Sequence, residues 1–298
     1  MKVSLITPAK KLSRAGNRTT AVRWGRILQA LGHRVRVSTE YDEEPADLMV
    51  ALHAWRSFES IRRFRERYPD RPLIVALTGT DIYRFLASHP EPTLRSMEMA
   101  DRLVCLHDLV YQDIPARFGD KLEVIYQSAH PLPRPRSPSK RHFDICVVGH
   151  LREEKDPLRT ALAARDLPAS SRIRIVHLGK AHDADWAERA KAEMARNPRY
   201  IWRGDVPGWV VRKEFVKTRL MVLSSVMEGG ANVISEAIVA GVPVIASDIP
   251  GSIGLLGQDY PGYYPVRDTA ALTALLARTE TEPAFLDRLA HACADRAP

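Results

Sequence analysis

The stretch SVMEGGANVISEAIVAGVPVIA, from Ser225 to Ala246, decides the fold. Apolar residues recur at helical spacing after Gly230, which predicts a helix over residues 231–240. The apolar run LMVLSS precedes this helix, Gly241 ends it, and VPVIAS begins another short apolar run. The stretch therefore predicts a strand–helix–strand unit.

The start of this helix favours a negatively charged ligand. A helix entered through Glu-Gly-Gly-Ala-Asn leaves backbone N–H groups unpaired at its positive end, and glycine lets a ligand approach the backbone closely. Glu228 lies at the helix mouth and Glu236 lies between one and two turns further along, where carboxylates could accept hydrogen bonds from the hydroxyls of a ribose. For an isolated pair, a favourable helix dipole and a solvated face are the simpler interpretation.

Apolar runs alternate with helical patterns along most of the chain, which is typical of parallel sheets. The runs are VSLIT, VRVST, DLMVAL, LIVALT, RLVCL and LEVIY in the first half, and FDICVVG, IRIVHLG, YIWRG, LMVLSS and VPVIAS in the second. Between the halves, the proline-rich segment HPLPRPRSPSKRH can continue neither a helix nor a strand. We therefore predict an α/β protein with two Rossmann-like domains whose parallel sheets face a central cleft. The predicted boundaries are residues 1–131, a linker at 132–142, and residues 143–298.

Unusual residues gather where the predicted strands end, which is where open parallel sheets bind ligands. The loop after the first strand holds Lys10, Lys11, Arg14 and Arg18, and Asn17 is the predicted N-cap of the helix that follows. Thr78-Gly79-Thr80-Asp81 follows the fourth strand. The loop from Gly149 to Pro157 follows the first strand of the second half, with Asp156 as predicted N-cap and Pro157 as first helical residue. Taken together, these loops indicate one shared anionic ligand.

The net charge of +8 over 298 residues fits nucleic acid, an anionic membrane or anionic small substrates. No zinc-finger spacing, aromatic RNA-binding motif or basic tail is present, so we expect no nucleic-acid partner. The segment WRSFESIRRFRERYP could lie on an anionic membrane, but such helices more often pack on a sheet and leave their arginines in water. We favour the sheet and do not expect a membrane partner.

No apolar run approaches the ~20 residues of a membrane span, and the start MKVSLITPAKK lacks the features of a signal peptide. We therefore expect a cytoplasmic protein. Cys105, Cys146 and Cys293 have no metal-site spacing and are predicted to be buried free thiols.

The spacing of the two glutamates is similar to that in a known group of enzymes. Glu228 and Glu236, followed by AIVAGVPVIAS, resemble the donor-site motif of retaining GT-B glycosyltransferases. The segment Gly149–Lys155 is similar to that group's segment in which an arginine and a lysine hold the donor pyrophosphate. Lys155 matches the lysine, whereas His150 stands at the arginine position and Arg152 lies close by. Thr78 stands where many relatives carry a histidine near the donor sugar.

A narrower resemblance covers nearly the whole chain. It is carried by RAGNRTTAVRW, MVALHAW, VALTGTD, IYQSA, VVGHLREEKDPLR, ASSRIRIVHLG, MEGGANVISEA and IPGSIGLLGQDYPGYYPV, which resemble the selenosugar synthases of selenoneine biosynthesis. The resemblance implies an enzyme that joins selenophosphate to the sugar of a UDP-sugar, with UDP-N-acetylglucosamine as the first donor to test. It would release UDP and phosphate, and it implies no metal or other cofactor.

The resemblance and the positions of the residues at strand ends together suggest a role for each candidate residue. The catalytic candidates are Glu228, Lys155 and Arg152; the donor-binding candidates are Gly149, His150, Arg203, Gly229, Gly230, Ala231, Asn232, Val233 and Glu236; the acceptor-binding candidates are Arg14, Gly16, Asn17, Arg18, Thr78 and Asp81. Elementary chemistry agrees, because selenophosphate is already an anionic, soft nucleophile that needs no general base. It does need cations beside the pyrophosphate, since like charges a few ångströms apart repel by about 1 to 4 kcal/mol.

Two other functions remain open at this point. One is a conventional GT-B transferase that moves a sugar from a nucleotide-sugar to a lipid or small-molecule hydroxyl, and the other is a non-catalytic nucleotide-sugar-binding module. The sequence leaves open the preferred hexose, the anomeric stereochemistry, the tolerance for thiophosphate, the residue that drives Se–P cleavage and the oligomeric state.

Overall fold

The computed structural model describes residues 1–297 except Leu12 and Arg14. By their contacts, the described residues form two compact units. Unit 1 comprises Met1–Gln127 together with the short segment Glu228–Asn232, and unit 2 comprises Ser128–Met227 together with the described chain from Val233 onward. Each unit contains one parallel sheet of six strands.

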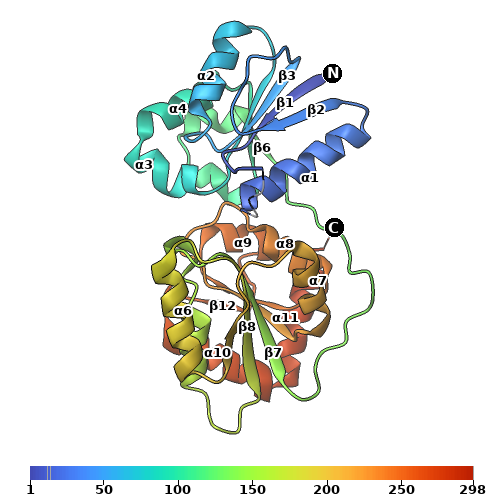
Figure 1. The fold of residues 1–298 in the computed structure, drawn as a ribbon, viewed down its shortest axis with the longest axis vertical. Coiled ribbons are helices and arrows are strands. Elements are labelled where there is room, and N and C mark those ends of the chain that lie inside the picture. Colours follow the sequence, from blue (N-terminus) through green and yellow to red (C-terminus); the bar gives the residue numbers. More distant parts are fainter. Residues whose placement is uncertain (12, 14, 298) are drawn as a thin grey trace. The chain divides into compact units, whose positions relative to one another are not determined.

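Unit 1 is an α/β domain with strand order β2-β1-β3-β4-β5-β6 (Figure 1). Its strands are β1 (Lys2–Ile6), β2 (Arg34–Ser38), β3 (Leu48–Leu52), β4 (Leu73–Ala76), β5 (Arg102–Cys105) and β6 (Leu122–Val124). Its helices are α1 (Gly16–Ala30), α2 (Phe58–Arg67), the π-helix η1 (Asp81–Phe85), α3 (Leu86–Ser88), α4 (Pro90–Met99) and the 3₁₀ helices η2 (Asp108–Gln112) and η3 (Ala116–Lys121).

The central strands β3 and β4 of unit 1 are apolar throughout because helices cover both faces of the sheet. Along β3, Val50 and Leu52 join a core on the same face as Ala21 of α1, whereas Met49 and Ala51 join the core that contains Phe64 of α2. Figure 1 shows α1 on one side of this sheet and α2 and α4 on the other. The alternation of side chains along a strand therefore explains the continuous apolar runs of the sequence.

Unit 2 has strand order β12-β11-β10-β7-β8-β9, and every neighbouring pair is parallel. Its strands are β7 (Phe143–Val148), β8 (Ile173–Leu178), β9 (Tyr200–Trp202), β10 (Leu220–Leu223), β11 (Val244–Ser247) and β12 (Tyr263–Tyr264). Its helices are the 3₁₀ helix η4 (Glu153–Lys155), α5 (Arg159–Arg165), α6 (Ala184–Arg196), α7 (Gly208–Lys217), α8 (Asn232–Val239), α9 (Pro250–Leu256), α10 (Thr269–Thr281) and α11 (Pro283–Ala294).

Each apolar run of the sequence contains an observed strand, so the predicted α/β architecture is confirmed. The two-residue strand β12 was missed, because Tyr263 and Tyr264 are too few to give an alternating pattern. All three cysteines are buried free thiols, as expected. The Arg-rich segment forms α2, which buries Ile61 and Phe64 against the sheet, as the favoured interpretation required.

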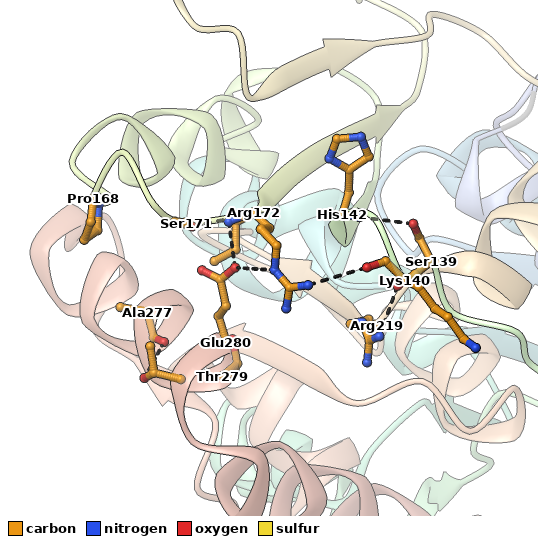
Figure 2. A network of polar contacts seen from close by, with 12 residues as sticks. Ser139, Lys140, His142, Pro168, Ser171, Arg172, Arg219, Ala277, Thr279 and Glu280 are labelled. Atoms are coloured by element: carbon orange, nitrogen blue, oxygen red, sulfur yellow. Dashed lines mark hydrogen bonds and ion pairs between the residues drawn. The ribbon is translucent and has the colours of Figure 1, made fainter.

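The proline-rich linker contains no helix or strand, as predicted, but it is fastened to unit 2. Arg136 donates to the carbonyls of Gly241 and, at 2.7 Å, of Thr218, while the Ser137 N–H donates to the Val216 carbonyl at 2.7 Å. Figure 2 shows the end of the linker beside the start of β8. There Arg172 donates to the Lys140 carbonyl at 3.5 Å and its backbone N–H donates to Glu280 at 2.7 Å.

Candidate functional site

The strand order of unit 2 reverses between β7 and β10, which is the point where open α/β sheets bind ligands. Both strands lead outward from this point into loops, residues 149–155 after β7 and residues 224–231 after β10. A small hollow opens there, lined by the last residues of both strands and by Gly149, His150, Lys155 and Ser224. Three of the predicted donor-site residues therefore meet at the switch point of the sheet.

The loop after β7 is held by the neighbouring loop after β8. The Leu151 N–H donates to the Lys180 carbonyl at 2.9 Å, and the His182 N–H donates to the Leu151 carbonyl at 2.9 Å. Below the loop, the Nε2 atom of His177 lies 3.0 Å from the Gly149 carbonyl oxygen. These contacts fix the backbone of the predicted pyrophosphate segment.

The same neighbouring loop fixes the tautomer of His150. The Lys180 backbone N–H donates to His150 Nδ1 at 3.1 Å, so Nδ1 is the acceptor and the proton of the neutral ring resides on Nε2. His150 can therefore present an N–H donor at the position where the resembling family has an arginine. Arg152 is less suited to that task, since its Nε lies 3.9 Å from the Glu154 carboxylate.

Lys155 closes the 3₁₀ helix η4 beside β10. The Ser224 hydroxyl donates to the Lys155 carbonyl at 3.2 Å and to the Asp156 carbonyl at 2.9 Å, which ties this turn to the end of β10. The predicted N-cap at Asp156 is wrong. Asp156 has a φ of 40°, in the left-handed region, and α5 begins only at Arg159, which Asp156 pairs with at 2.7 Å.

The two glycines of the Glu-Gly-Gly segment lie in close contact with other loops, which the sequence did not predict. In unit 1, a Cβ atom on Gly229 would lie 2.4 Å from the Gly79 nitrogen, and one on Gly230 would lie 2.5 Å from the Leu106 Cβ. Gly79 and Gly230 also have φ values of 120° and 116°, which favour glycine. The glycines therefore allow the backbone of residues 228–232 to approach the loops after β4 and β5.

Asn232 also belongs to unit 1, where its side chain is held by α1. Its Oδ1 accepts from Arg23 at 2.9 Å and its Nδ2 donates to the Thr20 hydroxyl at 3.2 Å. The side chain of Asn232 therefore already has two hydrogen-bond partners. The neighbouring Ala231 is buried and Val233 is half-buried.

Helix α8 places Glu236 away from the core. Ile234, Ala237 and Ile238 are buried, whereas Glu236 is half-buried and belongs to the opposite side of the helix. Glu228 is also half-buried, in the segment that belongs to unit 1. Arg203 is exposed at the end of β9, and its N–H donates to the His177 carbonyl at 2.9 Å.

The strand order of unit 1 reverses between β1 and β3. The loop after β1 leads into α1, whose N-cap is Ala15 rather than the predicted Asn17. The chain turns early because the Ala15 N–H donates to the Ser13 hydroxyl at 3.1 Å, so Gly16 and Asn17 form the first helical positions. No acidic residue occupies this first turn, and the Nε of Arg18 is buried without a hydrogen-bond partner among the described residues. Arg14 lies outside the described residues.

Asp81 supports the loop after β4 instead of facing a ligand. It is 0% exposed, and its carboxylate accepts from the backbone N–H groups of Thr78 at 2.9 Å, Gly79 at 2.7 Å and Ala54 at 3.1 Å. Because this buried carboxylate already accepts hydrogen bonds from three backbone N–H groups, Asp81 holds the loop after β4 in place. Thr78 remains half-buried.

Sequence reasoning missed the loop after β3, which shares the switch point of unit 1. His53 is buried with a φ of 76°, an uncommon conformation for a non-glycine residue. Its Nδ1 accepts from the Arg56 N–H at 3.2 Å and its Nε2 lies 3.0 Å from the Thr80 hydroxyl. Beside it, Trp55 stacks on Phe85 with ring centroids 3.9 Å apart. A histidine and a tryptophan directly after an apolar run were the available signal.

The two sheets and their helices define a GT-B fold, as comparison with solved structures confirms. Sucrose-phosphate synthase from Thermosynechococcus elongatus superposes with a TM-score of 0.81 at 16% identity, covering 99% of this chain and 94% of that one. Anabaena Alr3699/HepE, solved in complex with UDP-glucose, gives a TM-score of 0.75 at 14% identity with the same coverages. TarM from S. aureus, solved with UDP, gives 0.67 at 12% identity and covers 84% of this chain but 51% of TarM.

The family model of the glycosyl transferases group 1 matches residues 133–297, which is more than half of the chain. The protein therefore belongs to the glycosyl transferases group 1. A search among curated proteins returned no match. Within the part of the chain that the structure describes, no helix is long and apolar enough to cross a membrane, and no cluster of three or more His, Cys, Asp or Glu residues could hold a metal ion.

Proposed function

We propose that the protein transfers the sugar of a UDP-sugar to selenophosphate and so forms a selenosugar. The observation that carries the donor half is the convergence of Gly149, His150 and Lys155 on the hollow at the β7/β10 switch point. Family membership supports glycosyl transfer, and the complex of Alr3699/HepE with UDP-glucose supports a uridine nucleotide. The acceptor half rests on the sequence resemblance to the selenosugar synthases.

On the donor side, Lys155 and the Nε2–H of His150 bind the pyrophosphate. Negative charge grows on the departing UDP in the transition state, where preorganised donors are most effective. The backbone N–H groups of Gly229–Asn232 add to this stabilisation. Glu236 binds the ribose, Glu228 binds the hexose hydroxyls and Arg203 lies by the uracil. Arg152 plays a lesser part, because its guanidinium lies near the Glu154 carboxylate.

On the acceptor side, the first turn of α1 binds the phosphoryl oxygens of selenophosphate. Gly16 and Asn17 contribute backbone N–H groups and Arg18 contributes a guanidinium, which matches phosphate oxygens bidentately. Arg56, in the loop after β3, joins this set because β1 and β3 flank the switch point of unit 1. Thr78, held in place by Asp81, lines the same edge of the sheet.

The attack on the anomeric carbon needs no general base, because selenophosphate is already anionic. A selenium lone pair attacks the anomeric carbon, the C–Se bond forms, and the bond from that carbon to the β-phosphate oxygen breaks with its electrons leaving on UDP. Water then cleaves the Se–P bond and releases phosphate and the selenosugar. No metal is required in this scheme, since cationic side chains and helix N–H groups carry the leaving-group charge.

A second candidate is a conventional transferase with a hydroxyl acceptor. The Trp55–Phe85 stack favours it, because an aromatic face in the loop after β3 offers apolar contact to a sugar or other small alcohol. Such an enzyme would need a group to take the hydroxyl proton. His53 is the nearest histidine, but burial lowers its pKa and both ring nitrogens have partners.

The release of UDP from UDP-N-acetylglucosamine separates the two candidates. The purified protein would be incubated under anaerobic conditions with selenophosphate, thiophosphate, phosphate or a panel of sugars and alcohols. We expect UDP release with selenophosphate far above the rate in water alone. Release that depends on a hydroxyl acceptor and ignores selenophosphate would establish the conventional transferase instead.

A further inference from the structure

His177 lies buried directly beneath the loop that we assign to the donor pyrophosphate. It is part of β8, where it pairs with Val147 of β7, and it is 0% exposed. Its Nε2 lies 3.0 Å from the Gly149 carbonyl oxygen and its Nδ1 lies 2.9 Å from the Tyr200 hydroxyl. The sequence gives no role to this histidine.

These two contacts define one tautomer. A carbonyl oxygen can only accept a hydrogen bond, so Nε2 carries the proton and donates to Gly149. In the neutral ring Nδ1 is then the acceptor, and the Tyr200 hydroxyl donates to it. Burial keeps the ring neutral, because it lowers the pKa of His177 to about 4.

The Gly149 carbonyl depends on this donor. Gly179 lies so close that a Cβ atom on it would be 1.8 Å from the Gly149 oxygen, so the carbonyl is enclosed on that side. A buried carbonyl without a donor costs about 1 to 3 kcal/mol. The hydrogen bond from His177 therefore stabilises the orientation of the Gly149–His150 peptide in which the carbonyl oxygen points inward.

The direction of the carbonyl sets the direction of the neighbouring amide. In a trans peptide the C=O and N–H bonds point to opposite sides, and no cis bond is present among the described residues. With the Gly149 oxygen turned toward His177, the His150 N–H points away from the buried imidazole.

We propose that His177 is a positioning residue for the donor: through the Gly149 carbonyl it aims the His150 backbone N–H at the pyrophosphate of the nucleotide-sugar. This inference rests on the proposed function of the β7/β10 switch point. His177 also lines the hollow at the switch point but is 0% exposed, and its effect passes through one peptide plane. The imidazole ring replaces water as the partner of that carbonyl.

Three substitutions of His177 test the proposal by their effect on UDP binding, measured by calorimetry on the full chain. His177→Gln places an amide N–H near the position of Nε2 and keeps the donor, whereas His177→Asn is too short and His177→Leu has none. We expect the UDP dissociation constant to rise about tenfold in the Leu and Asn proteins, as one lost hydrogen bond to a buried carbonyl implies. The Gln protein should stay within about threefold of the wild type.

Tyr260→Phe is the matched control, because it removes a buried hydroxyl that donates to the carbonyl of Val244, the first residue of β11, whereas the hollow is lined by the last residues of β7 and β10. It should lower the melting temperature and leave UDP affinity unchanged. The proposal is overturned if the Leu and Asn proteins melt earlier but bind UDP as the wild type does, or if Gln weakens binding as much as Asn. Should the Leu protein not fold, the Gln and Asn proteins decide the matter. A wild-type protein that binds no UDP would refute the proposed function itself.

Discussion

At the residue scale, the proposed donor site is built from residues whose backbone is held by hydrogen bonds within the protein. His150 receives a hydrogen bond from the Lys180 N–H, and the turn that carries Lys155 is tied to β10 through Ser224. Such preorganisation matters because donors that need not rearrange stabilise a leaving group more effectively. Single substitutions can therefore test the contribution of each residue of the proposed site.

Lys155 carries the first residue-scale prediction. Lys155→Ala should raise the dissociation constant for UDP about 10- to 100-fold, because a hydrogen bond to a charged group contributes about 1.5 to 3 kcal/mol. Calorimetric titration with UDP measures the change. Lys191→Ala serves as the control, since Lys191 is an exposed lysine of unit 2 paired with Glu188 on α6. Equal affinities in both variants would remove Lys155 from the donor site.

Arg18 carries the corresponding prediction for the acceptor. Arg18→Ala should raise the selenophosphate concentration for half-maximal rate by about tenfold or more, through loss of a charge-assisted hydrogen bond. UDP affinity should change little, because Arg18 belongs to α1 of unit 1. The exposed Arg26 lies further along the same helix and gives the control Arg26→Ala. Unchanged acceptor kinetics in the Arg18 variant would show that the anion binds elsewhere.

The pH dependence of stability follows from His177. Its folded-state pKa of about 4 lies below the ordinary value of 6.5, so the unfolded chain binds the proton first as pH falls. The contribution of the neutral ring is complete above pH 6.5 and is lost between pH 6.5 and 4, a change of roughly 3 kcal/mol at 1.36 kcal/mol per pKa unit. Urea unfolding at several pH values should show this loss, and His177→Gln should reduce it. An identical pH profile in the Gln protein would contradict the assignment.

At the element scale, strands were predicted well and helix starts were not. The central strands β3, β7, β10 and β11 are buried on both faces, so their apolar runs report the burial directly. A helix start depends on the backbone of the preceding turn instead. The N-cap of α1 is Ala15 and not Asn17, because the Ala15 N–H donates to the Ser13 hydroxyl and the chain turns early. Asp156 adopts a left-handed conformation, so α5 begins only at Arg159.

The candidate site divides in the same way. Gly149, His150 and Lys155 could be predicted because they stand in a loop at a strand end, where polar residues and glycine interrupt an apolar pattern. His177 could not be predicted, because it lies inside the apolar run IRIVHLG and its partners come from elsewhere in the chain, Gly149 from the loop after β7 and Tyr200 from β9. The hydrogen bonds that hold the Asp81 carboxylate likewise include one from the Ala54 N–H, which is distant in sequence.

The glycines of segment 228–232 give an element-scale prediction. Gly79→Ala should lower the free energy of unfolding by about 1 to 3 kcal/mol, since the new Cβ would lie 2.4 Å from the Gly229 nitrogen at a φ of 120°. Gly119→Ala, in η3 of the same unit with no atom within 4 Å of the new Cβ, should be nearly neutral. Chemical denaturation of both variants provides the measurement. Equal stability would mean that the close approach of the two loops is not required.

At the scale of the whole molecule, each unit has one sheet with one switch point. In the proposed reaction, unit 1 binds the acceptor and unit 2 binds the donor pyrophosphate. The loops after β1 and β3 of unit 1 are basic, and the loops after β7 and β10 of unit 2 hold the pyrophosphate candidates. The net charge of +8 suits two anionic substrates. The GT-B fold and the glycosyltransferase family could both be predicted from the sequence. The proposed acceptor, selenophosphate, rests on the sequence resemblance to the selenosugar synthases.

Mass spectrometry of the reaction product tests the central claim most directly. Wild-type protein and Glu236→Ala would be incubated under anaerobic conditions with UDP-N-acetylglucosamine and freshly prepared selenophosphate. We predict a sugar product with the isotope pattern of selenium, accompanied by UDP, and strongly reduced in the Glu236→Ala protein. Absence of any selenium-containing product from an otherwise UDP-binding wild-type protein, across several UDP-sugars, would contradict the account.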